Sequence, residues 1–476
     1  MTNSPSSTRR FHDMRAAVLL AVLWVALLAG TAAGQTPPAP EPDPAMAQRP
    51  QAGAPAPPAA TPSASAASSA TSSVQLPPNY DAAGPFYNGT ALHDLQITMK
   101  PGDWETLKAN YALDTYYPAD FRWRDIKVPT IGVRSRGFGS RNATKPGLRL
   151  DFNSYLGEQK FLGLSAMILA NAVQEPAMLN LRLSMSVFAA MELPAPRVVH
   201  ARLFVNGEYV GLYEAVEAVE KAFLRRAFGW DSTGKKRRDE GYLFEYKWEP
   251  GYAWSYFGFD LARYTRLFEP KSHELEAPSV LYGPIDDMLR TINEVSDGDF
   301  EARVGEYLFL AVFIRHLAVE RFISDIDGFL GDWGPANFYL YRFEGRKLSA
   351  VIPWDKDRTF YDLNDDIYRG FERTVLGQRI MALPALRRMY LESLLDCAAT
   401  VAQPDAPGSA VSWLEAELLR ERAQILTAAQ IDGNKPYSNE RVDEAHQALL
   451  HFVRNRSAYV TDLAQRELER LAPGIR

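Results

Sequence analysis

Two runs of strand-forming residues in the second half of the chain most limit what it can fold into. The runs at 338–343 and 348–352 are aromatic and aliphatic, and residues 344–346 between them (Glu-Gly-Arg) are typical of a tight turn. The pattern predicts a β-hairpin that ends at Pro353, because proline has no backbone N–H for further pairing. A hairpin brings the residues before its first strand and those after its second strand to the same end.

Acidic and amide side chains stand on both sides of this hairpin: Asp325, Asp327, Asp332 and Asn337 before it, Asp355 and Asp357 after it. Their oxygen atoms form a hard ligand set that suits Mg²⁺ or Mn²⁺ better than zinc. Asp332 and Asn337 are five positions apart, the interval found in a protein-kinase catalytic loop. Asp, Asn and Gly are also ordinary turn formers, so a solvated loop is the alternative. Two acidic clusters at one hairpin favour a site.

A glycine- and arginine-rich stretch from 134 to 153 is the second candidate region. Its glycines permit tight turns and close approach of the backbone. Its cations are Arg134, Arg136, Arg141, Lys145 and Arg149. Backbone donors together with cations are what polyphosphate binding requires. The alternative is an exposed basic hairpin on a solvated surface.

The first 78 residues are expected to lie outside the folded part. Arginines followed by an apolar run and small residues predict a secretory signal at 1–34, with an uncleaved anchor as the alternative. Residues 35–78 are almost entirely Pro, Ala, Ser, Thr, Gly and Gln, which predicts a disordered tether. Cys397 is the only cysteine, so an exported form has no internal disulfide, and a buried structural thiol is expected there.

The remaining residues, 79–476, predict an α+β fold. Expected strands are 93–99 and 127–134, expected helices are 101–110, 177–191, 300–321, 412–430 and 439–471, and a hairpin with a type I′ turn at Asn206-Gly207 joins 198–205 to 209–213. Beyond that hairpin, Glu214, Glu217 and Glu220 are three residues apart, and His316 is expected to be a buried interior histidine. The pattern predicts a mixed N-terminal lobe at about 79–250, a mainly helical C-terminal lobe at about 251–476, and a cleft between them. The net charge of −6, without a basic stripe, excludes nucleic acid as an expected partner.

An ordered series of short motifs resembles the CotH kinase family, the spore coat protein H type of secreted, atypical protein kinase. The motifs are RGFGSR at 136–141, TKPGLRLDF at 144–152, LPAPR at 193–197, NGEYVGLYEAVE at 206–217, DGF at 327–329, NFYLY at 337–341 and IPWDKD at 352–357. Each motif is short, but together their order and spacing span most of residues 90–360.

The resemblance implies a divergent two-lobed protein-kinase-like fold that binds ATP with Mg²⁺ or Mn²⁺ and phosphorylates secreted proteins. It implies phosphate or nucleotide contacts from the basic stretch and from an acidic position after the second hairpin, that is from Arg136, Arg141, Lys145, Arg149 and Glu217. Asn337, Asp355 and Asp357 would hold the metal. The catalytic base is Asp327 by the Asp-Gly-aromatic signature or Asp332 by its interval to Asn337, and the sequence leaves this choice open.

Three functions follow from the sequence. The first is an exported kinase of Ser or Thr side chains in secreted or surface proteins, tethered by its N-terminal segment or released. The second is a catalytically weak relative that serves as a structural or binding protein of a cell surface. The third is a metal-dependent hydrolase that uses the same carboxylates.

Overall fold

The computed structural model describes residues 81–229 and 238–471, which all belong to one compact unit, Gln75–Arg476. The predicted signal segment at 1–34 and tether at 35–78 lie outside these residues. Strands and helices are both abundant in the described part, so the predicted α+β class is confirmed.

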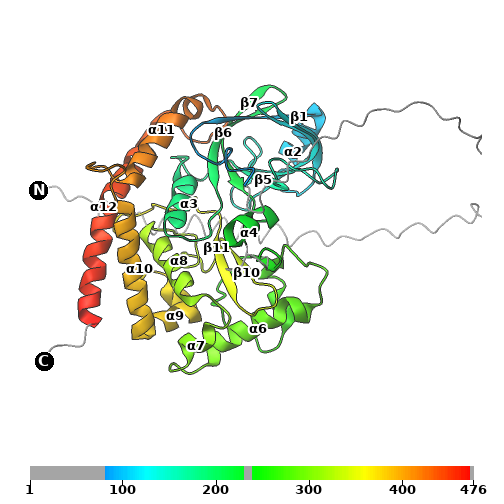
Figure 1. The fold of residues 1–476 in the computed structure, drawn as a ribbon. Coiled ribbons are helices and arrows are strands. Elements are labelled where there is room, and N and C mark those ends of the chain that lie inside the picture. Colours follow the sequence, from blue (N-terminus) through cyan, green and yellow to red (C-terminus); the bar gives the residue numbers. More distant parts are fainter. Residues whose placement is uncertain (1–80, 230–237, 472–476) are drawn as a thin grey trace, which may run out of the picture. The chain divides into compact units, whose positions relative to one another are not determined.

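A closed β-barrel forms the N-terminal half of the described residues, at the top of Figure 1. Its strands are β1 His93–Met99, β2 Tyr117–Trp123, β3 Ile126–Ser135, β4 Leu148–Asp151, β5 Ala166–Ala170, β6 Val198–Val205 and β7 Glu208–Glu217. The order around the barrel is β1-β2-β3-β4-β5-β7-β6, and the parallel pair of β1 and β6 closes it. The other neighbours are antiparallel.

The core of the barrel combines aliphatic side chains with a group of aromatic rings. Residues of β1 alternate between buried and exposed, as expected for a strand with one solvated face. Phe121 and Phe152 each pack against Phe161 inside, with ring centroids 5.0 and 5.4 Å from it. Strand β7 is buried at nearly every position, because helix α11 (Trp413–Ile431) covers its outer face. The barrel is therefore joined to the C-terminal helices through β7.

A second sheet has the order β11-β10-β8-β9 and is antiparallel throughout. Its strands are β8 Tyr242–Tyr246, β9 Phe268–Pro270, β10 Phe338–Arg342 and β11 Ser349–Pro353. Strands β10 and β11 are the predicted hairpin, and Phe338 lies opposite Pro353 at its end. Strand β8 comes before the lobe boundary expected at about residue 250, and β10 comes after that boundary. The two strands nevertheless pair in one sheet.

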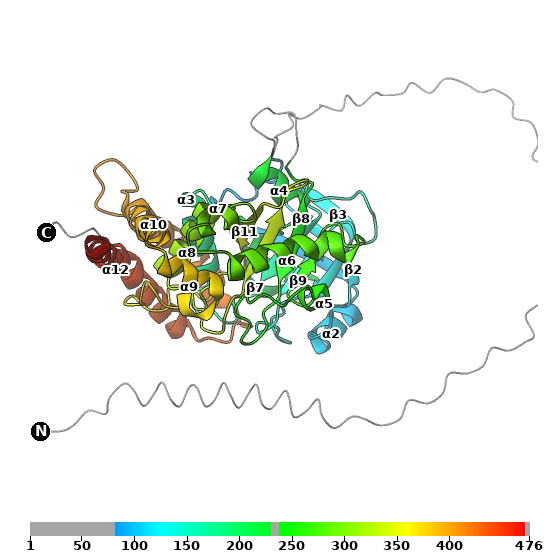
Figure 2. The same ribbon diagram turned by 90° about the horizontal axis from the view of Figure 1, so that it is seen from below.

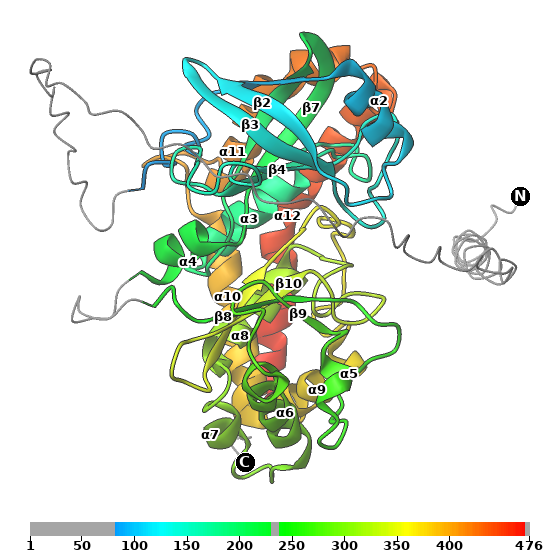
Figure 3. The same ribbon diagram turned by 90° about the vertical axis from the view of Figure 1, so that its right-hand side faces the viewer.

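Helices surround this sheet and continue along the barrel. They are α2 Pro101–Ala109, α3 Asn180–Ala190, α4 Lys221–Phe228, α5 Leu261–Tyr264, α6 Pro278–Glu294, α7 Phe300–Val304, α8 Leu310–Phe322, α9 Val375–Ala382, α10 Pro384–Ala402, α11 and α12 Asn439–Leu471, with a 3₁₀ turn at Phe371–Arg373. Helices α10 and α12 lie side by side (Figure 2). Helix α12 extends from the level of the barrel to that of the second sheet (Figure 3), and α11 packs on β7 and α3. No helix in the described ranges is long and apolar enough to cross a membrane.

Most predicted elements are present within a few residues of their expected bounds. The predicted turn at Asn206 and Gly207 has φ values of 53° and 86°, as a type I′ turn requires. Cys397 is a buried free thiol on α10, and burial raises its pKa. The prediction of one helix over 300–321 is wrong. The chain breaks between α7 and α8, because residues near Leu308 pair with Ser349, the first residue of β11.

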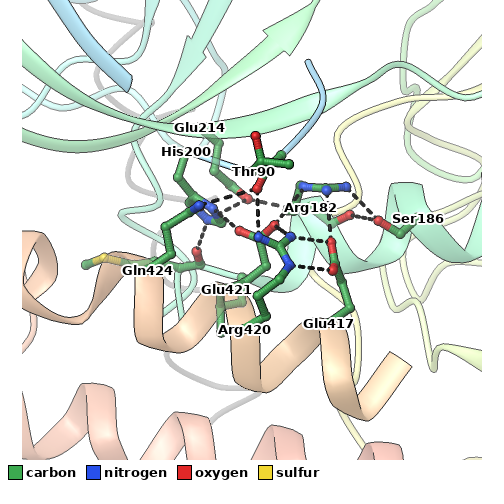
Figure 4. A network of polar contacts seen from close by, with 12 residues as sticks. Thr90, Arg182, Ser186, His200, Glu214, Glu417, Arg420, Glu421 and Gln424 are labelled. Atoms are coloured by element: carbon green, nitrogen blue, oxygen red, sulfur yellow. Dashed lines mark hydrogen bonds and ion pairs between the residues drawn. The ribbon is translucent and has the colours of Figure 1, made fainter. Parts of the chain in front are cut away.

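A polar network fixes α11 against the barrel and α3, as Figure 4 shows. His200 on β6 lies 2.7 Å from Glu421 Oε2 through Nδ1 and 2.7 Å from the Met178 carbonyl oxygen through Nε2. Arg182 on α3 pairs with Glu417 and Glu421 of α11. His200 and Glu421 are fully buried, so these contacts set the position of α11 relative to the barrel.

Candidate functional site

The mouth of the β10–β11 hairpin is the end at which β10 begins and β11 ends. One residue from each side of the hairpin has an unusual backbone conformation there. Asn337 and Asp355 have φ values of 56° and 51°, a left-handed conformation that Asn and Asp tolerate better than most residues. Asn337 Nδ2 donates to the Asp327 carbonyl oxygen at 2.8 Å, and the Trp354 N–H donates to the Asn337 carbonyl oxygen at 3.1 Å. Asn337 therefore connects the acidic loop before the hairpin to the segment after it.

The acidic side chains on the two sides form one electrostatic cluster. Burial raises the pKa of Asp327 to about 7, and the negative charges of Asp325 and Asp355 contribute to the rise. The pKa of Asp357 is raised well above its ordinary value by burial and by Asp355, Asp327 and Asp325. Like charges that repel one another in a partly buried place favour binding of a proton or a cation. Asp327, Asp355 and Asp357 thus lie close enough for their charges to affect one another.

Asp325 also belongs to this cluster, and its carboxylate is paired with Lys356. Lys356 Nζ lies 2.9 Å from Asp325 Oδ2 and 2.7 Å from Glu320 Oε1, and these side chains are 0–1% exposed. His316 Nε2 is 3.1 Å from the same Glu320 oxygen, which confirms the expectation of a buried interior histidine. Sequence reasoning missed Lys356 and Glu320. The available signal was the charged pair Glu320-Arg321 at the end of a mainly apolar helix.

Asp332 has a different environment from Asp327. Its carboxylate is 39% exposed and lies 3.2 Å from Arg369 Nε and 3.5 Å from Arg373 NH2. Arg369 also pairs with Asp365 at 2.6 Å. The two candidate bases are therefore distinct: Asp327 is largely buried beside other carboxylates, and Asp332 is held by two guanidinium groups.

Among the predicted phosphate-binding cations, Arg136 is the one paired with the acidic cluster. Its NH2 atom lies 3.9 Å from Asp355 Oδ2, and its guanidinium lies over the Trp354 ring, 5.6 Å from the centroid. The other cations of the stretch have carboxylate partners elsewhere: Arg134 and Arg141 pair with Asp114, Arg149 pairs with Glu220, and Lys145 pairs with Asp432. The loop is neither a solvated basic hairpin nor a set of free cations.

Lys145 is fully buried in this arrangement. Its Nζ atom is 2.8 Å from Asp432 Oδ2 and 5.2 Å from the centroid of the Tyr213 ring. The same Asp432 oxygen accepts from the Leu212 N–H at 3.0 Å. Asp432 follows α11, so the C-terminal region supplies the partner of a motif lysine in the barrel. The sequence offered no signal for this pair, because 287 residues separate its members.

Glu217 is also placed apart from the acidic cluster. It lies at the end of β7, is buried, and accepts from Arg197 NH2 at 2.9 Å and Arg226 NH2 at 2.7 Å. Its carboxylate is thus occupied by two guanidinium groups. Its predicted nucleotide contact remains a prediction.

Glu175 is an acidic residue near the cluster that sequence reasoning did not select. Its Oε1 atom accepts from the N–H groups of Leu179 and Asn180 at the start of α3, and its buried Oε2 atom has no hydrogen-bond partner. Burial raises its pKa to about 8, with a contribution from the charge of Asp357. Asn180 Nδ2 donates to the Asp357 carbonyl oxygen at 3.2 Å, which links this corner to the site.

Over residues 81–229 and 238–471, no three His, Cys, Asp or Glu side chains lie close enough together to hold a metal ion. The donors at the hairpin mouth nevertheless have the right chemistry. The carboxylates of Asp355 and Asp357 and the side-chain oxygen of Asn337 are hard ligands, and a divalent cation would offset the mutual repulsion of the aspartates. Mg²⁺ commonly takes only one or two carboxylates and completes its shell with phosphates and water.

A family model described as CotH kinase protein matches residues 133–460. The chain belongs to the CotH kinase family. This confirms the family indicated by the motif series, and the match covers the basic loop, the acidic cluster and the C-terminal helices. A family relative, the inner spore coat protein H of Bacillus subtilis (strain 168), is 25% identical over 389 residues, which are 79% of this chain and 98% of that protein.

The present chain is also similar to a solved structure. The crystal structure of the Helicobacter pylori proinflammatory kinase CtkA matches 69% of this chain and 95% of its own, with 10% sequence identity and a TM-score of 0.27. A TM-score this low adds nothing to the argument for a kinase-like lobe arrangement.

Proposed function

We propose that this CotH family member is an exported protein kinase that transfers the γ-phosphoryl group of ATP to Ser or Thr side chains of secreted or surface proteins. Family membership supports a kinase-type activity. Export rests on the signal-like segment at 1–34, and attachment to a surface rests on the tether at 35–78.

The observation that carries this proposal is the approach of Arg136 to Asp355, at 3.9 Å. A cation from a glycine-rich loop then faces Asp355, whose neighbours Asp327 and Asp357 have pKa values raised by burial and by nearby negative charges. Phosphoryl transfer requires this combination, because catalysis consists mostly of positioning the phosphates and neutralising the charge that develops on them. The two groups would contact the phosphates from opposite sides.

In this proposal Asp355, Asp357 and Asn337 would hold Mg²⁺ or Mn²⁺, which would supply positive charge next to the phosphates. Arg136 orients the phosphates from the loop. The acceptor hydroxyl gives its proton to a carboxylate of the loop before the hairpin. Asp327, which is coupled to Asp355, is the first choice as base, and Asp332 is the alternative.

The test is transfer of label from γ-labelled ATP by residues 79–476 with Mn²⁺ and a generic protein acceptor. We expect incorporation or autophosphorylation that falls at least about 100-fold in Asp355→Asn, since metal-held phosphates are the basis of the rate. Arg122→Met, at an exposed arginine on β2, is the control and should match the wild type. Equal, background-level incorporation by wild type and Asp355→Asn would refute the kinase proposal.

A catalytically weak surface protein is the second candidate. The observation that favours it is the pairing of Lys145, Arg141 and Arg149 with carboxylates, which leaves few cations available for a nucleotide. Absence of ATP binding by the wild type, measured by calorimetry with Mn²⁺, would support this function. Release of phosphate from phosphoesters without ATP would instead support a metal-dependent hydrolase.

A further inference from the structure

Lys356 lies between Asp355 and Asp357 in the sequence, and its side chain is fully buried. Its ammonium group lies 2.9 Å from Asp325 and 2.7 Å from Glu320. Each of the three side chains is at most 1% exposed. Burying three ionised groups is costly unless their geometry and hydrogen bonds compensate. The remaining contacts of the two carboxylates supply that compensation.

Both carboxylates hold backbone N–H groups of the loop that contains Asp327. Asp325 Oδ1 accepts from the Asp327 N–H at 2.9 Å. Glu320 accepts from the Phe329 N–H at 2.9 Å and from the Leu330 N–H at 3.1 Å. Three amides of the segment 327–330 are therefore anchored on two carboxylates that a single lysine holds in place.

Gly328 shows how closely this loop lies on the ion pair. A Cβ atom added there would be 2.4 Å from both Asp325 Oδ2 and Glu320 Oε1, too close for any side chain. The Asp-Gly-Phe motif thus needs its glycine because the backbone rests directly on the carboxylates. The loop has no room to shift while the ion pair is intact.

We propose that Lys356 is a positioning residue, an internal cation that fixes the loop carrying Asp327 relative to Asp355 and Asp357. It touches neither nucleotide nor acceptor in this role. It acts through Asp325 and Glu320, which hold the loop before the hairpin. Because Lys356 is the neighbour in sequence of Asp355 and Asp357, it connects that loop to the segment after the hairpin. The expected loss of activity rests on the proposed kinase function. The expected loosening of the loop does not depend on that function.

The first test is amide hydrogen exchange, followed by mass spectrometry of peptides that cover 325–332. In Lys356→Met we expect exchange of this segment to be about tenfold faster or more, since its amides lose their anchored acceptors. Peptides from strand β1 should exchange as in the wild type. Lys347→Met, at a lysine whose side chain is 54% exposed on the hairpin turn, is the matched control and should change neither.

The second test is kinetic. A misplaced loop should lower kcat about 100-fold while KM for ATP changes less than about threefold, because a displacement of order 1 Å acts on the chemical step. Lys356→Arg keeps the charge and should recover part of kcat. Where Lys356→Met does not fold, Asp325→Asn tests one arm of the arrangement, since it removes the charge that pairs with Lys356 at nearly constant volume and leaves the Lys356–Glu320 contact in place.

Two outcomes would overturn the proposal. One is exchange of 325–332 at the wild-type rate in a folded Lys356→Met variant. The other is an increase spread equally over the barrel, which would indicate general destabilisation. If the wild type transfers no phosphate, the kinase proposal fails while the exchange result still decides the role of Lys356.

Discussion

Lys145 Nζ lies 2.8 Å from Asp432 Oδ2, and neither side chain is exposed to solvent. The lysine belongs to a motif of the barrel, and the aspartate follows α11 near the end of the chain. Burial lowers the pKa of Lys145, and the charge of Asp432 offsets this only in part. Removing either member would leave the other charge buried without its partner. The C-terminal helices are thereby part of the structure that supports the basic loop.

Asp432→Ala should therefore destabilise the protein strongly. It leaves the Lys145 ammonium buried without a partner, and removal of one member of a buried pair costs about 3–5 kcal/mol. The free energy of unfolding from urea denaturation measures this loss. Asp462→Ala, which breaks the exposed Asp462–Arg466 pair, is the control and should cost less than about 1 kcal/mol. Similar losses in both variants would contradict the interpretation of the buried pair.

Gly211→Ala tests the same contact from the barrel side. The residue has φ +148°, and an added Cβ would lie 2.7 Å from Asp432 Oδ2. We expect a loss of about 1–3 kcal/mol from backbone strain, with a further loss from displacement of Asp432. Gly102→Ala, where no atom lies within 4 Å of an added Cβ, should be neutral or slightly stabilising. Thermal unfolding of both variants provides the comparison.

The His200–Glu421 pair predicts a pH dependence of stability. Burial opposes the shift, but the Glu421 hydrogen bond and charge raise the pKa of His200 above its ordinary value of 6.5. Despite burial, the hydrogen bond and charge of His200 lower the pKa of Glu421 to about 2. The stabilisation from His200 is thus complete below about pH 6.5 and is lost as the pH rises through its folded pKa. That from Glu421 is lost as the pH falls towards 2.

His200→Gln should remove the alkaline part of this dependence. The measurement is the unfolding midpoint between pH 5.5 and 9, where the wild type should lose stability relative to the variant. His451→Gln, at an exposed histidine of α12, should retain the wild-type slope. Parallel curves for wild type and His200→Gln would rule out the charged pair.

Glu175→Gln should raise stability at neutral and alkaline pH. The pKa of Glu175 is raised to about 8 by burial, with Asp357 adding to the rise, so ionisation between pH 4.5 and 8 favours the unfolded chain. Glutamine keeps the acceptor for the Leu179 and Asn180 N–H groups but carries no charge. Urea denaturation at pH 5 and pH 8 should show a gain at pH 8 that is smaller or absent at pH 5. An equal change at both values would mean that charge is not the cause.

The two candidate bases can be separated by substitution. A general base contributes about 10²–10⁴-fold to the rate. We expect Asp327→Asn to lose activity by that factor and Asp332→Asn to lose much less. Burial raises the pKa of Asp327 to about 7, so the plot of rate against pH should fall below about pH 7. The midpoint of this fall should move to lower pH as the Mn²⁺ concentration increases, because the cation offsets the neighbouring negative charges. A larger loss of activity in Asp332→Asn would identify Asp332, which contacts Arg369 and Arg373, as the base.

Short-range patterns in the amino-acid sequence were enough to predict the local structure and the family. The β10–β11 hairpin, the turn at Asn206-Gly207 and helix α12 follow from short-range patterns, namely turn residues and hydrophobic period, which depend on neighbours in the chain. The motif series indicated the CotH kinase family for the same reason, since each motif is contiguous. The pattern also placed Asp327, Asp355 and Asp357 near one hairpin mouth, because hairpin geometry is local.

Tertiary structure alone decided which charged groups meet. The pairs Lys145–Asp432 and Lys356–Glu320 join segments that sequence periodicity does not relate, and they leave Arg136 as the cation of the basic loop that is paired with the acidic cluster. The break between α7 and α8 has the same origin, since pairing with Ser349 overrides the helical pattern there. Burial is the physical reason: a charge removed from water takes its partner from whatever the fold brings within a few ångströms, whatever the distance along the chain.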